Sequence, residues 1–242
     1  MPICQLCHLE RTLCKSHIVP EFLYSPLYND KNTLMAISGS GNKGWKPLNK
    51  GITEHLLCSD CEKLINDKYE KPFKKEWEGK VALPENIFKG EIYTATYNYS
   101  KFKLFHLSIL FRASVSTNPM FHAVKLGKHE EIIRKMLIVE NPGEPTVYPI
   151  LAFAITDTQN KVEKKIITQP TVSRIEGQLV YSQIYAGAMW SISVSSHPNQ
   201  TFIKCGLQPT GDINFIAEPL SEIAIIRDAS RALKRSQNKV RD

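Results

Sequence analysis

Cysteines are the residues of this 242-residue chain whose types and spacing most directly suggest chemistry. Four of the six cysteines form two C-x-x-C pairs, Cys4 with Cys7 and Cys58 with Cys61. Two thiolates three positions apart on a tight turn can both reach one ion at about 2.3 Å, and two such pairs complete a tetrahedral sulfur site that suits zinc. The spacing therefore predicts a structural Zn²⁺ held by Cys4, Cys7, Cys58 and Cys61.

Other interpretations of the cysteines are less favoured. A ligand set in which Cys14 or His17 replaces one of the paired cysteines stays open from the sequence alone. A thioredoxin-like redox role fits badly, because the pairs lie about 50 residues apart and no βαβ pattern surrounds them. Cys205 stands in a strand-like run, residues 202–206, and is expected to be an inert buried thiol.

The segment between the pairs carries a second motif. It contains Lys15-Ser16-His17-Ile18-Val19-Pro20, then a glycine-rich loop over residues 38–51, and then Glu54-His55-Leu56-Leu57 leading into Cys58. Residues 62–70 after the last cysteine have the pattern of a helix. This order of C-x-x-C, His-Ile-x-Pro, loop, Leu-Leu-Cys-x-x-Cys and helix resembles the zinc-stabilised HNH nuclease superfamily over roughly residues 3–70. The resemblance implies a treble-clef, ββα fold around a structural zinc, with a separate catalytic divalent metal.

The resemblance also implies roles for individual residues. His17 matches the general base, and an imidazole with a pKa near 6.5 suits that role at cellular pH. Ser16 and Glu54 stand near positions where the superfamily has a metal-binding Asp or His and an Asn. Glu62 stands where a His follows the last cysteine, and carboxylates bind Mg²⁺ or Mn²⁺ well. Asn66 shares the helix face of Glu62.

Because Ser16, Glu54 and Glu62 differ from the residues that the superfamily usually has at these positions, two functions stay open. The first is an HNH-like endonuclease, a metal-dependent nucleic-acid phosphodiesterase with a non-standard ligand set. In it His17 and Glu62 would face one open cleft about 5–8 Å apart, with Mg²⁺ or Mn²⁺ held by Glu62 and completed by Asn66 or Glu54. Glu70, two turns beyond Glu62, is a weaker candidate ligand. The second is a non-catalytic zinc-stabilised module that binds nucleic acid or protein. His8 and His55, beside the cysteine pairs, are expected at the surface.

Composition bounds the partners and the location. The formal net charge of +7 is compatible with a nucleic acid, DNA in our interpretation, and a protein partner is the alternative. The chain lacks the roughly 20-residue apolar run of a membrane span and the opening pattern of a signal peptide, so we expect a cytoplasmic protein without membrane contact.

The elements that position these residues predict an α+β protein. We expect a zinc module over residues 1–80, in which the helical pattern breaks at 71–73 and a polar connector follows at 74–80, and a second domain over 81–242. That domain should contain helices at 101–115 and 128–139, with His106 a hydrogen-bonded core residue. Strands are expected as an antiparallel sheet, followed by a closing helix at 220–233 with a basic tail. The expected strands cover residues 92–97, 147–155, 165–168, 178–186 and 189–194.

Overall fold

The computed structural model describes residues 1–30, 34–36, 46–48, 51–79 and 83–223. The first part of the chain is a two-stranded antiparallel hairpin of β1 (Leu13–His17) and β4 (Thr53–Cys58). Between them come the short helix α1 (Glu21–Tyr24), the 3-10 turn η1 (Ser25–Leu27) and a small ribbon of β2 (Leu34–Ala36) with β3 (Lys46–Leu48). The rest of the loop expected at 38–51, apart from Gly51, lies outside the described residues.

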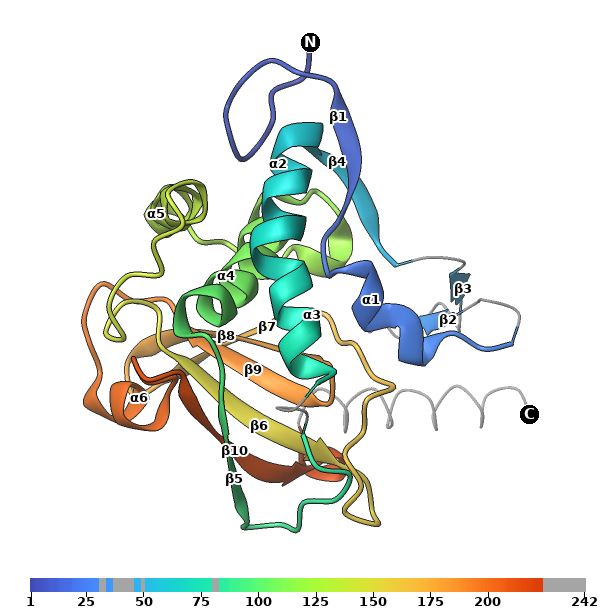
Figure 1. Ribbon diagram of the computed structural model, residues 1–242, viewed down its shortest axis with the longest axis vertical. Coiled ribbons are helices and arrows are strands. Elements are labelled where there is room, and N and C mark those ends of the chain that lie inside the picture. The colour runs from blue at the N-terminus through green and yellow to red at the C-terminus, as the bar shows by residue number, and fades with distance from the viewer. Residues whose placement is uncertain (31–33, 37–45, 49–50, 80–82, 224–242) are drawn as a thin grey trace, which may run out of the picture.

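A long helical rod follows β4 directly (Figure 1). It comprises α2 (Ser59–Ile65), one π-helical turn η2 (Asn66–Glu70) and α3 (Lys71–Trp77). The sequence predicted that this helix ends near Glu70 and that a polar connector follows, and both predictions are wrong. Pro72 lies in the first turn of α3, where its missing N–H is tolerated, and the burial of Phe73 and Trp77 stabilises the continuation.

The second part of the chain is built on a six-stranded sheet in the order β5-β10-β6-β9-β8-β7. Its neighbours are antiparallel except for β10 and β6, which run parallel, so the sheet is mixed and the purely antiparallel prediction is corrected. The strands are β5 (Ile92–Thr96), β6 (Ile150–Thr156), β7 (Thr171–Ile175), β8 (Gln178–Tyr185), β9 (Ala188–Ser193) and β10 (Asp212–Pro219).

Helices cover this sheet and connect its strands. The elements are α4 (Tyr99–Val115), the 3-10 turn η3 (Pro119–Phe121), α5 (Lys128–Ile138), α6 (Gln200–Cys205) and the 3-10 turn η4 (Leu220–Glu222). The two longer helices were predicted from their apolar spacing and are confirmed. The expected closing helix at 220–233 is described only as far as η4 and Ile223, and its remainder and the basic tail lie outside the described residues.

Three local predictions for the second part fail. Residues 165–168 form no strand, whereas β7 and β10 were not predicted. The run around Cys205 is the helix α6, started by the Asn199 side chain accepting from the Phe202 N–H, and Cys205 is exposed. A six-residue apolar run does not distinguish a strand from a short helix, and the capping asparagine decides it here.

One hydrophobic core spans the expected boundary at residue 80. The Phe73 ring of α3 stacks on Phe105 of α4 with centroids 3.7 Å apart, and Trp77 packs edge-on against Trp190 of β9 at 5.5 Å. The buried His106 of α4 lies in the same cluster and bonds the Tyr185 hydroxyl at 2.6 Å, as expected of a core histidine. The rod therefore packs on the helices and sheet that follow it, and the division into two domains stays a prediction.

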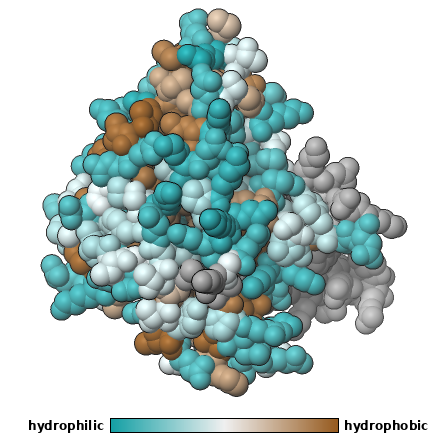
Figure 2. Space-filling view, in the orientation of Figure 1, coloured by the Kyte–Doolittle hydropathy of each residue, from teal (hydrophilic) through white to brown (hydrophobic). Residues whose placement is uncertain are grey.

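Exposed surfaces differ between the rod and α5. Figure 2 shows hydrophilic side chains along the rod and a hydrophobic patch over α5, which includes Ile132 and Val139. Among the described residues, no helix is long and apolar enough to span a membrane.

Candidate metal centre and the histidine site beside it

The four paired cysteines come together at one end of the β1–β4 hairpin. Their sulfur atoms all lie within 4.8 Å of one another, and Cys7 Sγ is 3.9 Å from Cys58 Sγ. Tetrahedral Zn–S bonds of 2.3 Å place sulfur atoms about 3.8 Å apart, so the cluster has the size of a zinc site. The four cysteines could therefore hold a metal ion such as zinc.

Backbone hydrogen bonds hold the first pair in place. The Cys4 N–H donates to Leu9 O, and the His8 N–H returns to Cys4 O, with His8 in the left-handed region at φ 60°. The Gln5 N–H donates to Leu56 O of β4, which ties this turn to the hairpin. Cys58 ends β4 and Cys61 lies in the first turn of α2, so strand end, helix start and turn converge on one point.

The surroundings of the cluster favour the thiolate form of Cys4, whereas burial raises the pKa of Cys7 and of Cys61. Burial raises the pKa of Cys4, but N–H groups that include those of Cys7 and Cys58 outweigh it and lower that pKa to about 7. The Cys58 N–H lies 3.3 Å from Cys4 Sγ. From α5, Arg134 donates to Leu6 O at 2.6 Å and adds a cation near the cluster.

The alternative ligand sets with Cys14 or His17 are not what the structure forms. The group of His, Cys, Asp or Glu side chains close enough to share an ion consists of the four paired cysteines, and the described residues contain no second such group. A preassembled acidic site for Mg²⁺ or Mn²⁺ is therefore not present in that part of the chain.

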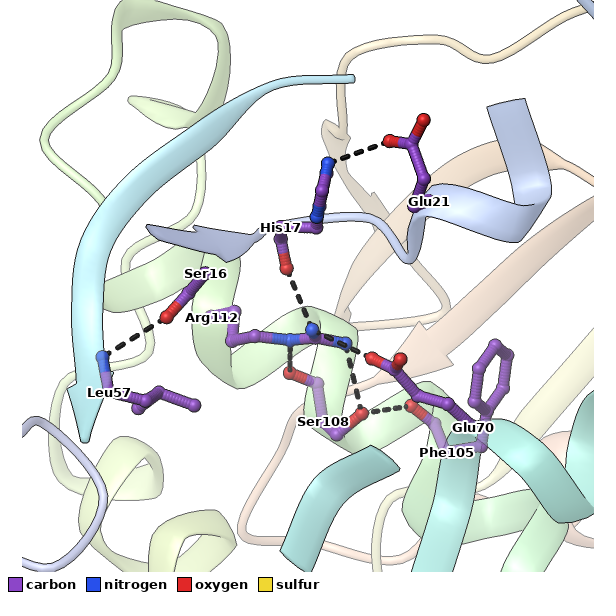
Figure 3. Close-up of polar contacts among 8 residues, drawn as sticks. All are labelled: Ser16, His17, Glu21, Leu57, Glu70, Phe105, Ser108 and Arg112. Atoms are coloured by element: carbon purple, nitrogen blue, oxygen red, sulfur yellow. Dashed lines mark hydrogen bonds and ion pairs between the residues drawn. The ribbon is translucent and has the colours of Figure 1, made fainter. Parts of the chain in front are cut away.

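His17 lies at the other end of the hairpin, where β1 stops. Its Nε2 is 2.7 Å from the Glu21 carboxylate, and its side chain is 27% exposed (Figure 3). Glu21 in turn accepts a hydrogen bond from the Tyr28 hydroxyl at 2.5 Å, and the Gly51 N–H donates to that hydroxyl. Burial, together with the neighbouring Glu21, raises the pKa of Tyr28 to about 12, so Tyr28 stays a donor.

Ser16 and Glu54, expected near the catalytic metal, both form hydrogen bonds within the protein. Ser16 is fully buried, and its Oγ accepts from the Leu57 N–H at 3.1 Å. Glu54 accepts hydrogen bonds from the Ser116 and Thr117 hydroxyls and from the Thr117 N–H. Both oxygen groups therefore brace the hairpin, one across its strands and one against the end of α4.

Glu62 and Asn66, the two residues of the rod expected as metal ligands, differ in their exposure. Glu62, in the first turn of α2, has a buried Oε1 without a hydrogen-bond partner among the described residues, and Asn66 is exposed. No hydrogen bond or ion pair between described residues joins Glu62 to His17. Instead, Glu70 reaches the end of β1 through Arg112, whose Nη1 lies 2.9 Å from Glu70 and donates to His17 O at 2.7 Å (Figure 3).

The sequence did not reveal Glu21, Tyr28 or Arg112 as neighbours of His17. The spacing of Glu21, four residues after His17, was a signal that could have been used. Nothing local connects Arg112 to His17, because 95 residues separate them. His8 and His55, expected at the surface, are both exposed.

Comparisons with known proteins give no family for this chain. No protein-family profile, curated protein or solved structure matches it. The resemblance to HNH nucleases therefore depends on the residues of the N-terminal part alone.

Proposed function

We propose that this chain is a nucleic-acid phosphodiesterase of the HNH type, with His17 as the general base. In this proposal residues 1–80 are a treble-clef, ββα module built around structural zinc, and residues 81–242 form the second domain. The observation that carries it is the pair of His17 and Glu21 at the end of β1. A half-exposed imidazole oriented by a carboxylate is the arrangement that positions a histidine to take a proton from water.

The chemistry follows from the two ring nitrogens of His17. Nε2 lies 2.7 Å from the Glu21 carboxylate, at ion-pair distance but without completing a hydrogen bond, and Nδ1 has no hydrogen-bond partner among the described residues. Nδ1 then accepts the proton of a water whose oxygen forms a new bond to phosphorus. The bond to the leaving sugar oxygen breaks, and that oxygen takes a proton from solvent. Tyr28 keeps Glu21 in place throughout, because its hydroxyl donates to the carboxylate.

A divalent ion would stabilise negative charge on the phosphate and on the leaving oxygen. Of the expected ligands, Glu62 has a carboxylate oxygen that is buried without a partner among the described residues, but it follows Cys61 at the zinc end of the hairpin, opposite to His17, so it is not placed beside His17. Ser16 and Glu54 do not fit, because their oxygens are already hydrogen-bonded. Mg²⁺ is commonly bound by one or two carboxylates plus substrate phosphates, so one protein carboxylate suffices for an ion that arrives with the nucleic acid.

The net charge of +7 over the whole chain supports a nucleic-acid partner, DNA in our proposal, although the rod itself carries five lysines and five carboxylates. Five exposed lysines follow its surface, and two of them, Lys63 and Lys75, have no ion pair among the described residues. The five are Lys63, Lys68, Lys71, Lys74 and Lys75. Binding through such contacts weakens steeply as salt rises, because each releases condensed counterions.

Cleavage assays test the proposal. Zinc-loaded protein is incubated with plasmid DNA, single-stranded DNA and RNA in Mg²⁺, Mn²⁺ or EDTA. We expect cleavage that falls about 100-fold or more in His17→Ala, as removal of a general base predicts. His55→Ala is the matched control, because His55 lies on the same hairpin and is exposed. Wild-type protein that cleaves none of these substrates, or a His17→Ala variant that cleaves normally, contradicts the proposal.

The second candidate is a non-catalytic zinc-stabilised module that binds nucleic acid or protein. The observation that favours it is the use of Ser16 and Glu54 as structural braces, which leaves the expected catalytic ligand set incomplete. In that case wild-type protein binds DNA with a steep salt dependence but does not cleave it, or binds no nucleic acid and has a protein partner.

A further inference from the structure

Arg112 is an arginine of α4 that is buried within the protein rather than placed at its surface. Its side chain is 1% exposed, and its guanidinium contacts three different segments (Figure 3). Nη1 lies 2.9 Å from a Glu70 carboxylate oxygen and donates to His17 O at 2.7 Å, while Nε donates to Ser108 O at 3.3 Å. A charge this deeply buried persists only where it is paired and hydrogen-bonded, and here the planar fork of arginine meets both requirements.

The π turn η2 accompanies the placement of Glu70. A π turn adds one residue to a helical turn, so the residues after it face about 100° away from where a regular helix would carry them. Tyr69, in the same turn, donates to Leu137 O of α5 at 2.6 Å, and Glu70 meets Arg112 of α4. The irregular turn therefore directs two consecutive side chains at the two helices that pack behind the hairpin.

His17 O lies at a corner of the backbone. The strand β1 ends at His17, the Ile18 N–H donates to Ile52 O, and α1 starts at Glu21 without a side-chain cap. The ψ angle of His17 sets the direction of its carbonyl relative to its Cα–Cβ bond. It also sets where the chain carries Glu21, four residues later, relative to the imidazole. A donor that fixes this carbonyl therefore fixes the geometry of the His17–Glu21 pair.

We propose that Arg112, paired with Glu70, is a positioning residue for His17, supplied to the N-terminal site by the second part of the chain. This inference rests on the proposed function and extends it, because it makes α4 a component of the site. Arg112 touches neither substrate nor the reacting nitrogen, and it acts through the backbone of His17. A lysine does not replace it, because a single ammonium group cannot reproduce the fork that meets Glu70, His17 and Ser108 together.

Kinetics of Arg112→Lys and Glu70→Gln test this proposal. Displacement of a general base by about 1 Å costs on the order of 100-fold in rate, so we expect kcat to fall about 10- to 100-fold with KM little changed. Zinc content and far-ultraviolet circular dichroism establish that each variant is folded. Glu70→Gln keeps the side-chain shape and serves where Arg112→Lys is too unstable to assay.

Arg134→Lys is the matched control. Arg134 is a mostly buried arginine that also pairs with a glutamate, Glu131, and donates to a main-chain carbonyl, but that carbonyl is Leu6 O at the zinc end. It should lower stability and leave kcat unchanged. The decisive measurement adds each substitution to His17→Ala. Because Arg112 acts through His17, Arg112→Lys should cause no further loss of the residual rate in that background.

The outcomes separate this inference from the proposed function. If wild-type protein shows no His17-dependent cleavage, the proposed function falls and the positioning role falls with it. If His17-dependent cleavage is found but Arg112→Lys and Glu70→Gln leave kcat unchanged, the positioning role alone is overturned. It is likewise overturned if Arg112→Lys lowers the rate equally with and without His17.

Discussion

The two ends of the β1–β4 hairpin are organised in opposite ways. At the zinc end, the four cysteine side chains converge on one another, and they are the one such group of potential metal ligands among the described residues. At the His17 end, most polar groups are engaged by structural partners, with Glu21 on Tyr28, Glu54 on Ser116 and Glu70 on Arg112. The zinc end is thus built from two short cysteine motifs of the N-terminal part alone. The His17 end, in contrast, depends on residues that the rest of the chain packs against it.

Cys58→Ser should have the largest effect, because it removes one ligand of the zinc site. We expect loss of zinc and unfolding of the first part of the chain, since structural zinc contributes on the order of 10 kcal/mol in small modules. Elemental analysis and thermal melting measure both effects. Cys205→Ser is the control, because Cys205 is exposed in α6 and lies outside the cluster. Zinc retained at one ion per chain in Cys58→Ser would contradict the assignment of the site.

Arg112→Met should destabilise the His17 end of the hairpin without loss of zinc. Removal of one partner of a buried ion pair leaves Glu70 and His17 O unpaired and costs about 3–5 kcal/mol of unfolding free energy. Urea denaturation measures this cost, and the zinc content should stay that of the wild type. Arg174→Met on the exposed edge strand β7 should change stability by less than about 0.5 kcal/mol. Loss of zinc on Arg112→Met would show that the two ends are not separable.

Lys103 is a useful contrast to Arg112, because it is a buried cation with no carboxylate bonded to it among the described residues. Within that part of the chain its ammonium donates to the Tyr99 hydroxyl and to Glu144 O, and burial lowers its pKa to about 7. The unfolded chain therefore binds more protons between pH 7 and about 10.5, so this group costs most stability at pH 7 and below and least above pH 10.5.

Lys103→Met should accordingly stabilise the protein at pH 7, by on the order of 2 kcal/mol, where Arg112→Met destabilises it. The gain should shrink as the pH approaches 10.5. Urea titrations at several pH values measure it, with Lys101→Met, exposed on the same helix, as the control. A loss of stability at pH 7 would mean that the two hydrogen bonds outweigh the burial of the charge.

Glu54→Gln should have the smallest effect and tests a single brace of the His17 end. Burial alone would raise the pKa of Glu54, but hydrogen bonds from Ser116 and Thr117 bring it below the usual 4.5. The bonds to the charged carboxylate therefore stabilise the fold above pH 4.5, and this contribution is lost as the pH falls through the lowered pKa.

We expect Glu54→Gln to cost about 1–2 kcal/mol at pH 7 and less at pH 3. Thermal melts at the two pH values measure the difference, and Glu10→Gln, exposed near the N-terminus, is the control. An equal cost at both pH values would assign the effect to packing rather than to charge.

Sequence and structure agree where the determining contacts are local. The cysteine spacing predicted the cluster, and apolar periodicity predicted α4 and α5. Apolar alternation is absent from β7, which is an exposed edge strand, whereas β10 has it in Ile213, Phe215 and Ala217 and could have been predicted from this pattern. The rod beyond Glu70 was missed because a proline was taken as a stop, although its position in a first turn allows the helix to continue.

The His17 end shows the same limit more sharply. The histidine was identifiable from its motif, but Arg112 is fixed to it only by the packing of α4 behind the hairpin. Ser16 looked like a ligand by position, yet its burial against Leu57 N makes it a strand brace. Such assignments need the tertiary contacts, because a hydroxyl or carboxylate has the same sequence signature in either role.

The position of β10 has a consequence for biosynthesis. This strand is the last one in the described chain, yet it lies between β5 and β6 and is the sheet neighbour of β5. Until residues 212–219 leave the ribosome, β5 has no neighbour in this sheet and one edge of β6 is unpaired, which are conditions that favour misassociation. The four cysteines of the cluster all lie within the first 61 residues, so the nascent chain can gather them before β10 completes the sheet.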